Sequence, residues 1–319
     1  MGRDLIFVPT AGPAAHHDAG RAWQRLGTGA PPASIESLTV EGVEPLLNSQ
    51  VFRLVRSGQP PVIAKLAARG SLAVEVAVYS ELLPGWAGVP RFLGAVDDDD
   101  AGRGWLFLEE ARGERFHESR SRHPVALART LVELHRSTIG RTRPASVPPL
   151  HASDRFRLVQ LALERLAAGL ANPLLTPDER SELSRSRRVV EQVRDDWPRL
   201  AAAAEAGQTC LVHSDLVGKN VIVGVDRAVL LDWAAAAWGV PAEDLASIDV
   251  PTYVAGLAGA WPGGDMDSVT RLGHAGSVLR DLSLIQATAT GLAGQWVARS
   301  VRNIGYYTDR LSWRWARLA

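Results

Sequence analysis

The side chains best suited to chemistry lie in one segment of the chain, where acidic and amide groups follow an apolar strand. Asp215 precedes Asn220 by five positions, and Asp232 follows Asn220 by twelve. Two short apolar strands joined by the turn 224–227 lie between Asn220 and Asp232, and they predict a hairpin that brings these two residues together. Three oxygen-bearing side chains are therefore expected at one edge of a small sheet.

This set of groups suits phosphoryl transfer. Mg²⁺ prefers oxygen ligands and keeps several waters, so the Asp232 carboxylate and the Asn220 amide are candidate ligands of a nucleotide-bound Mg²⁺. A separate carboxylate, that of Asp215, is a candidate general base that orients an acceptor hydroxyl and takes its proton. Each residue taken alone is explained as readily by a loop cap or a turn, because short motifs are common.

The lysines give a second signal, because the chain has only two of them, Lys65 and Lys219, among 35 basic residues. Lysine carries a compact point charge where arginine carries a planar fork, so a lysine retained in an arginine-rich chain indicates chemistry that arginine cannot perform. Lys65 lies in an apolar strand, and Lys219 directly precedes Asn220. Lys219 is a candidate catalytic residue that reaches the γ-phosphate or the acceptor; the alternative is an exposed lysine on a loop.

A metal hydrolase is the alternative chemistry for the same segment. His213, Asp215 and Asp232 could ligate a metal through a His-x-Asp motif. The other histidines lie in dissimilar segments, so the remaining ligands are hard to find. Phosphoryl transfer is the preferred interpretation.

The elements that must position these groups change in character after Glu110. Before it, residues 71–83 predict a helix that ends at Pro84, and the predicted strands cover residues 37–40, 51–55, 62–66, 92–96 and 105–108. After it, helices are predicted from Pro124, over 154–170, over 177–206 with Thr176 as N-cap, and from about 242 to the end. The strand-rich segment 211–232 interrupts them.

This order predicts an α+β fold. Residues 1–35 are expected to form an N-terminal extension outside the fold, residues 36–111 a small lobe of strands with one helix, and residues 112–319 a large, mostly helical lobe. The family resemblance described next implies that the small lobe binds a nucleotide and that the large lobe carries the catalytic loop, the metal site and the acceptor site.

Several motifs together resemble the aminoglycoside phosphotransferase and choline kinase family. The motifs are His213-x-Asp215-x4-Asn220, Leu231-Asp232-Trp233 and Gly239-x-Pro241-x2-Asp244-Leu245-Ala246. The resemblance implies a two-lobed protein-kinase-like fold with an antiparallel sheet, Asp215 as catalytic base, and Asn220 and Asp232 as Mg²⁺ ligands. His213 belongs to the same catalytic motif, and Asp244 would be structural.

The first half of the chain carries the resemblance independently. Residues 62–65 resemble the strand whose lysine, here Lys65, contacts the α- and β-phosphates, and Glu75 resembles its ion-pair partner on the next helix. Residues 48–54, which begin with Asn48 and Ser49, resemble the loop and strand that cover the phosphates. Residues 107–111 resemble the hinge, whose backbone at Glu109 and Ala111 holds the adenine. ATP or GTP with Mg²⁺ is thereby implied.

The chain departs from the family pattern at three places. Ser214 stands where the family usually has glycine, and Gly42 is the only glycine of the phosphate-covering loop. Lys219 precedes Asn220 directly, whereas the usual kinase lysine stands two positions after the aspartate.

Composition limits the other functions. Acidic and basic residues both number 35, so the formal net charge is zero, which argues against nucleic acid or a membrane as partner. The single Cys210 rules out an internal disulfide. Residues 1–13 lack a signal-peptide core and no apolar stretch is long enough to cross a bilayer, so a cytoplasmic protein is expected.

The identity of the acceptor is left open by the sequence. Residues 232–319 contain eight acidic and seven basic residues, so no acidic excess is present to attract a polycationic aminoglycoside. A hydroxyl of a small molecule, such as an antibiotic or another secondary metabolite, is the expected acceptor. The alternatives are Ser or Thr of a peptide in natural-product biosynthesis, with a partner protein, and a non-catalytic kinase fold that binds a nucleotide or a protein.

Overall fold

The computed structural model describes residues 5–27, 29–40, 49–98, 102–294 and 297–318. The chain divides into two compact units. The sheet unit comprises residues 1–117, 144–147 and 217–236, and the helical unit comprises residues 118–143, 148–216 and 237–319.

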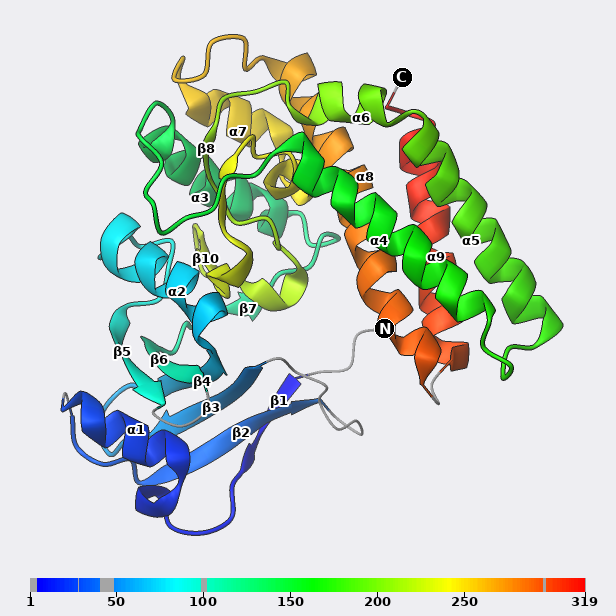
Figure 1. Cartoon of the computed structure of the whole chain (residues 1–319). Helices are drawn as coiled ribbons and strands as arrows, with labels where there is room; N and C mark the ends of the chain where they lie inside the picture. The colour runs from blue at the N-terminus through cyan, green and yellow to red at the C-terminus, as the bar shows by residue number, and fades with distance from the viewer. Residues whose placement is uncertain (1–4, 28, 41–48, 99–101, 295–296, 319) are drawn as a thin grey trace. The chain divides into compact units, whose positions relative to one another are not determined.

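An antiparallel sheet of six strands is the frame of the sheet unit, with the spatial order β1-β2-β3-β4-β6-β5 (Figure 1). The strands are β1 (Leu5–Pro9), β2 (Ser34–Val40), β3 (Ser49–Val55), β4 (Val62–Ala68), β5 (Phe92–Asp98) and β6 (Arg103–Glu109). The register places Lys65 of β4 opposite Val51 of β3 and Leu106 of β6. Strands expected from residue 37 to residue 108 are thus found, each extended by two or three residues.

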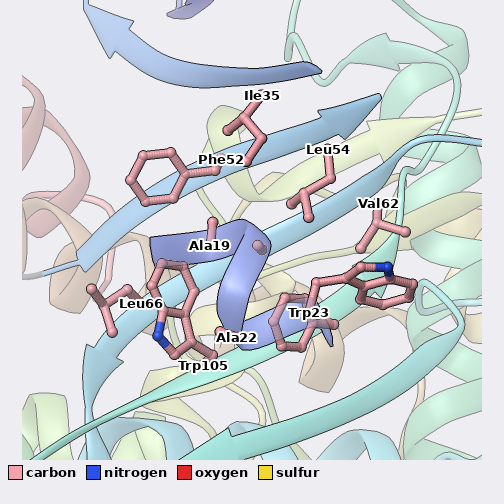
Figure 2. Close-up of a cluster of buried hydrophobic side chains, with 11 residues drawn as sticks. Ala19, Ala22, Trp23, Ile35, Phe52, Leu54, Val62, Leu66 and Trp105 are labelled. Atoms are coloured by element: carbon pink, nitrogen blue, oxygen red, sulfur yellow. The ribbon is translucent and has the colours of Figure 1, made fainter. Parts of the chain in front are cut away.

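The two faces of β4 have different roles. Val62, Ala64 and Leu66 are buried in an apolar cluster with aromatic side chains of the neighbouring strands (Figure 2). Side chains alternate between the faces of a strand, so Lys65 lies on the opposite face. The alternation of β4 therefore keeps the lysine out of the apolar cluster.

Helix α1 (Asp18–Leu26) covers the apolar face of this sheet, after the short 3-10 turn η1 (Ala14–His16). Ala19, Ala22 and Trp23 of α1 are buried in the same cluster as the strand side chains (Figure 2). The structure differs here from the expected extension over residues 1–35. The reason is physical: β1 pairs with β2 along its whole length, and α1 supplies side chains to the core.

Helix α2 (Arg69–Ala77) continues without a break into the π-helical turn η2 (Val78–Leu82). It contacts β4, β6 and the 3-10 turn η4 (Trp233–Ala235). These two segments correspond to the single helix predicted over residues 71–83.

The predicted hairpin is formed by β9 (Val221–Val223) and β10 (Ala228–Leu230), after the 3-10 turn η3 (Gly218–Asn220). Strand β9 also pairs with β7 (Glu114–Arg115). The prediction assigned residues 112–319 to the helical lobe, whereas residues 112–117 and 217–236 belong to the sheet unit. The pairing of β7 with β9 explains this difference.

Helices dominate the helical unit. They are α3 (Arg122–Thr138), α4 (Ala152–Leu170), α5 (Pro177–Asp195), α6 (Trp197–Ala204), α7 (Val250–Leu257), α8 (Met266–Ala289) and α9 (Val297–Trp315). Helices α4, α5, α9 and α8 pack on one another in turn, and α3 packs on α7 (Figure 1). The short elements η5 (Glu243–Ser247) and η6 (Thr290–Ala293) contact α8, and β8 (Cys210–Val212) pairs with β11 (Ala237–Gly239).

One predicted helix is divided in two. The sequence predicts a single helix over residues 177–206, and the expected Thr176 cap is present: its Oγ1 accepts a hydrogen bond from the Glu179 N–H at 3.3 Å. Helix α5 nevertheless ends at Asp195 and α6 begins at Trp197. Pro198 causes the break because it has no N–H to donate within a continuing helix.

Of the helices that the structure describes, none combines the length and the hydrophobicity that crossing a bilayer requires.

Candidate active site

Lys65 lies between two carboxylates on the face of the sheet opposite to α1. Its Nζ is 2.5 Å from Oε1 of Glu75 on α2 and 2.6 Å from Oδ1 of Asp232 at the end of the hairpin. Of the three side chains, Glu75 is 1% exposed, Lys65 12% and Asp232 36%. The structure thus brings together three predicted site residues from three separate segments, with Asp232 the most open to a ligand.

Burial and charge shift the ionisation of this group. Burial is the largest effect on Glu75 and, with the nearby Asp232 charge, it raises the pKa of Glu75 to about 7, although Lys65 opposes the shift. Burial lowers the pKa of Lys65, but the charges of Glu75 and Asp232 have the larger combined effect, so this pKa lies above its ordinary value. Lys65 is therefore a fixed cation, and Glu75 titrates near neutral pH.

The hairpin places Asn220 next to Asp232 in the sheet unit, as predicted. The Leu231 N–H donates a hydrogen bond to the Asn220 carbonyl at 2.8 Å, one residue before Asp232, and the Gly224 N–H closes the turn onto the Arg227 carbonyl at 2.9 Å. Asp232 itself has a left-handed backbone with φ of 63°. A non-glycine residue held in this region marks a local constraint, and such residues concentrate at functional sites.

Asp232 and Asn220 fit a Mg²⁺ site at this edge. A carboxylate and an amide are hard oxygen donors, and Mg²⁺ bound with a nucleotide needs only one or two protein ligands beside phosphates and waters. The Asp232 carboxylate is one-third exposed, which leaves room for a cation. Lys219, by contrast, lies in η3 with an exposed side chain.

The remaining predicted nucleotide contacts lie on the sheet and at its end. Ser49 begins β3 opposite Ala67, whereas Asn48 lies outside the described residues. The Glu109 carboxylate is 2.9 Å from Nε of Arg91, so this side chain is engaged in an ion pair. A contact of Glu109 or Ala111 with an adenine therefore remains a prediction, and it concerns only the backbone groups of these two residues.

The segment around Asp215, predicted to be catalytic, is held by Asp244 within the helical unit. Oδ2 of Asp244 accepts a hydrogen bond from the His213 N–H at 2.8 Å, and Oδ1 accepts one from the Ser214 N–H at 2.9 Å. Nδ1 of His213 accepts the Asp215 N–H at 3.3 Å, and the His213 side chain is fully buried. His213 thus has the geometry of a residue that positions the backbone before Asp215.

Asp244 remains ionised although it is buried. Burial would raise its pKa, but the hydrogen bond from His135 and the charges of His135 and His213 bring the net direction below the ordinary value. The His135 ring lies 3.4 Å from Asp244 and 2.7 Å from the Tyr253 hydroxyl. Sequence reasoning missed Tyr253, because a tyrosine on an apolar helix gives no signal of a buried polar partner.

Ser214 explains one departure from the family pattern. Its φ is 65°, in the left-handed region that glycine adopts without strain. Serine keeps this backbone while its N–H is fixed by Asp244. The serine that replaces the usual glycine thus has a glycine-like backbone, which the hydrogen bond to Asp244 holds in place.

A metal-hydrolase site is not found. Among the described residues, no three His, Cys, Asp or Glu side chains gather as a metal-binding group. The Nδ1 atom of His213 is occupied by the Asp215 N–H, so this histidine is a poor candidate ligand.

Comparison with known proteins agrees with the motifs. A model of the phosphotransferase enzyme family matches residues 39–250, a range that includes both units' candidate residues. No curated protein sequence matches the chain significantly.

Solved structures show the same fold at low sequence identity. The choline kinase of Cryptosporidium parvum has a TM-score of 0.58 and 13% identity over 89% of this chain and 90% of that one. Aminoglycoside 2'-phosphotransferase-IIIa, in its GDP complex, has a TM-score of 0.58 and 15% identity over 87% and 93%. The aminoglycoside phosphotransferase of Alicyclobacillus acidocaldarius has a TM-score of 0.55 and 16% identity over 86% and 90%. The predicted α+β kinase-like fold is confirmed.

Proposed function

Because the chain belongs to the phosphotransferase enzyme family, we propose that it transfers the γ-phosphoryl group of ATP or GTP to a hydroxyl of a small molecule. The observation that carries the proposal is Lys65 held between Glu75 and Asp232, at 2.5 and 2.6 Å. A fixed cation beside a carboxylate suited to Mg²⁺ is an arrangement for polyphosphate. The similar aminoglycoside 2'-phosphotransferase-IIIa binds GDP, which supports a nucleotide as donor.

The residues of the candidate site have separate roles in this proposal. Lys65 contacts the α- and β-phosphates, and Glu75 holds the Lys65 side chain in place. Asp232 and Asn220 would hold Mg²⁺, which supplies positive charge against the phosphate oxygens. The Asp215 carboxylate orients the acceptor hydroxyl and takes its proton, and Lys219 remains a candidate for contact with the γ-phosphate or the acceptor.

The acids of the helical unit favour an acceptor with little positive charge. A cation-binding pocket needs carboxylates that are not already engaged, and six of the acids after residue 236 have partners within the protein. They are Glu243 with Arg155, Asp244 with the His213 and Ser214 amides, Asp249 and Asp265 as helix N-caps, Asp281 with Arg310 and Arg314, and Asp309 with Arg185.

The first test is removal of the proposed base. Asp215→Asn keeps the size of the side chain but cannot take a proton, so turnover should fall by about two to four orders of magnitude. The affinity for Mg²⁺–nucleotide should not change, which also serves as the control for folding. Nucleoside diphosphate release measures turnover; an Asp215→Asn protein with full activity would remove Asp215 from the mechanism.

The second test concerns Asp232 and separates an enzyme from a non-catalytic binding protein. Asp232→Ala should abolish Mg²⁺-dependent nucleotide binding in calorimetry, because the carboxylate supplies the charged ligand. Asp226→Ala removes the same charge from the exposed hairpin turn and is the matched control. An unchanged Mg²⁺ dependence in Asp232→Ala would favour a non-catalytic kinase fold.

A further inference from the structure

A cluster of three arginines and two carboxylates joins α8, α9, η5 and the segment before α3 in the helical unit. At its buried end, Asp281 of α8 is fully buried and has ion pairs with Arg314 at 2.8 Å and Arg310 at 3.1 Å, both on α9. One carboxylate is thus shared by two guanidinium groups.

The third arginine of this cluster, Arg280, has a weaker acidic partner. Its Nη1 donates a hydrogen bond to the Ser247 hydroxyl at 2.7 Å, and that hydroxyl donates to the Glu118 carboxylate at 2.6 Å. Arg280 and Glu118 themselves are 3.7 Å apart, and Glu118 is 50% exposed. Glu118 is the main charge that raises the pKa of Arg280 against burial, but because its side chain is half-exposed, solvent screens part of this attraction.

The arginine cluster therefore has an excess of positive charge. Arg280, Arg310 and Arg314 are paired with only two carboxylates, Glu118 and Asp281, so among the described residues the cluster contains one more arginine than acid. Burial lowers the pKa of Arg280, and Arg310 and Arg314 lower it further against the opposing effect of Glu118. The Arg280 side chain is only 14% exposed, so its charge is poorly hydrated and would be stabilised by an anion.

The position of the arginine cluster connects it to the catalytic segment. Ser247 is the last residue of η5, three residues after Asp244, whose carboxylate holds the His213 and Ser214 amides. A 3-10 helix rises about 2 Å per residue, so Ser247 lies about 6 Å along η5 from Asp244. The same short helix therefore fixes the backbone before Asp215 and carries Ser247, the hydroxyl that links Arg280 to Glu118.

An exposed aromatic face adjoins the arginine cluster on α9. Tyr306, Arg310 and Trp313 are spaced by four and three residues and share one side of the helix. The Arg310 guanidinium lies 5.6 Å from the centre of the Tyr306 ring, and Tyr306 and Trp313 are 60% and 58% exposed. The Arg317 guanidinium lies 3.8 Å from the centre of the Trp313 ring, and a planar or apolar group beside the arginines would cover the parts of both rings that remain exposed.

We propose that the arginine cluster is the subsite for an anionic group of the acceptor, a carboxylate or a phosphate joined to a planar or apolar body. Arginine forks bind both groups in a bidentate manner, and the excess charge favours an anion over a neutral group. The anion would displace the half-exposed Glu118 side chain from Arg280. This inference rests on the proposed function, because it names the class of acceptor whose hydroxyl meets Asp215.

Matched acceptor analogues test the proposal by calorimetric binding to the full chain. The probes are 4-(hydroxymethyl)benzoate, its uncharged methyl ester, and 4-(hydroxymethyl)phenyl phosphate. We expect at least one of the two anions to bind about tenfold more tightly than the ester, a difference of about 1.4 kcal/mol. The tighter anion identifies whether a carboxylate or a phosphate is recognised. Equal binding of all three probes, or no binding of either anion, would overturn the proposal.

Variants locate the subsite. Arg280→Gln should remove the preference for the anion, and Arg280→Lys should retain part of it because the charge remains. Arg187→Gln on α5 changes the net charge equally, far along the chain from the cluster, and should retain the full preference. If Arg280→Gln does not fold, as seen by circular dichroism, the comparison of Arg280→Lys with Arg187→Gln decides. An unchanged preference in the Arg280 variants contradicts the assignment.

Nucleotide binding supplies an independent measurement. The affinity for Mg²⁺–nucleotide should be the same in the wild type and the Arg280 variants, because Lys65 and Asp232 belong to the sheet unit. If the wild type binds the anionic probes but no nucleotide, the proposed function fails while the anion subsite stands. If it transfers phosphoryl groups to the ester as well as to the anions, the subsite fails and the proposed function stands.

Discussion

Lys65 shows why a lysine, and not an arginine, suits the position between Glu75 and Asp232. In a chain with two lysines, this one is fixed between Glu75 and Asp232 by short hydrogen bonds. A single ammonium can point at two carboxylates and still release one of them to a metal, whereas a guanidinium fork would need more space. The sequence predicted Lys65 and Glu75 as partners; the bond from Lys65 to Asp232 depends on the path of the hairpin.

The ionisation of Glu75 predicts a pH dependence. Its pKa of about 7 means that the carboxylate is protonated as the pH falls through 7, which releases Lys65. Nucleotide affinity should therefore decline below pH 7. A raised pKa also means that the contribution of Glu75 to stability is greatest below its ordinary value of 4.5 and is lost as the pH rises towards 7. Affinity and this part of the stability thus change in opposite directions.

Calorimetric titration of nucleotide between pH 5.5 and 8.5, with urea unfolding over the same range, measures both effects. Glu75→Gln should bind nucleotide more weakly than the wild type and should lose the step near pH 7. A wild-type affinity that is flat across this range would contradict the role of Glu75.

At the scale of elements, α1 is the main feature that the sequence did not reveal. Residues 18–26 lie in a stretch rich in Gly, Ala, Pro and His, which the sequence assigned to an extension outside the fold. The buried side of α1 consists of two alanines, a glycine and Trp23, so its apolar signal is weak. Trp23 nevertheless contacts Phe107 edge-on at 5.4 Å and donates a hydrogen bond to the Ala30 carbonyl at 3.1 Å.

Trp23→Ala should destabilise the protein strongly. The side chain is 1% exposed, and truncation of a buried tryptophan costs about 3–5 kcal/mol. Urea unfolding followed by circular dichroism would show the loss. Trp313→Ala, at a position that is 58% exposed, is the matched control and should cost less than about 1 kcal/mol. Equal midpoints for the two variants would show that α1 does not contribute to the core.

The elements around the site were more predictable than α1, for a physical reason. Strand alternation and turn residues are local signals, so β4, the hairpin and the Thr176 cap could be read directly from the sequence. The carboxylate partners are not local: Asp244 reaches back 30 residues to the Ser214 amide, and Asp281 pairs with α9 across 33 residues. The family resemblance predicted a structural role for Asp244 but not the amides that it binds, and neither the ion pairs of Asp281 nor the pairing of β7 with β9 has a signal in a single sequence.

For the whole molecule, the distribution of charge matters more than its sum. The net charge is zero, which gives no long-range attraction for a polycation. Within the helical unit, the acids listed above are bound to arginines or to backbone amides, and Arg280, Arg310 and Arg314 outnumber their carboxylate partners. We therefore expect an acceptor that carries little positive charge.

The last prediction follows from this distribution of charge. Activity on aminoglycosides should be absent or poor, because six of the acids after residue 236 are already engaged within the described part of the chain and are not available to bind several ammonium groups. Capture by an acidic pocket would be fast and sensitive to salt, since exposed charges are screened over about 8 Å at physiological ionic strength. Steady-state kinetics on a kanamycin-like compound at low and high salt, beside a neutral hydroxylated metabolite and a Ser/Thr peptide, would measure both properties. Efficient turnover of the aminoglycoside that declines with salt would show that a local acidic cluster attracts the substrate despite the arginines. Turnover of the peptide alone would replace the small-molecule acceptor with the peptide alternative.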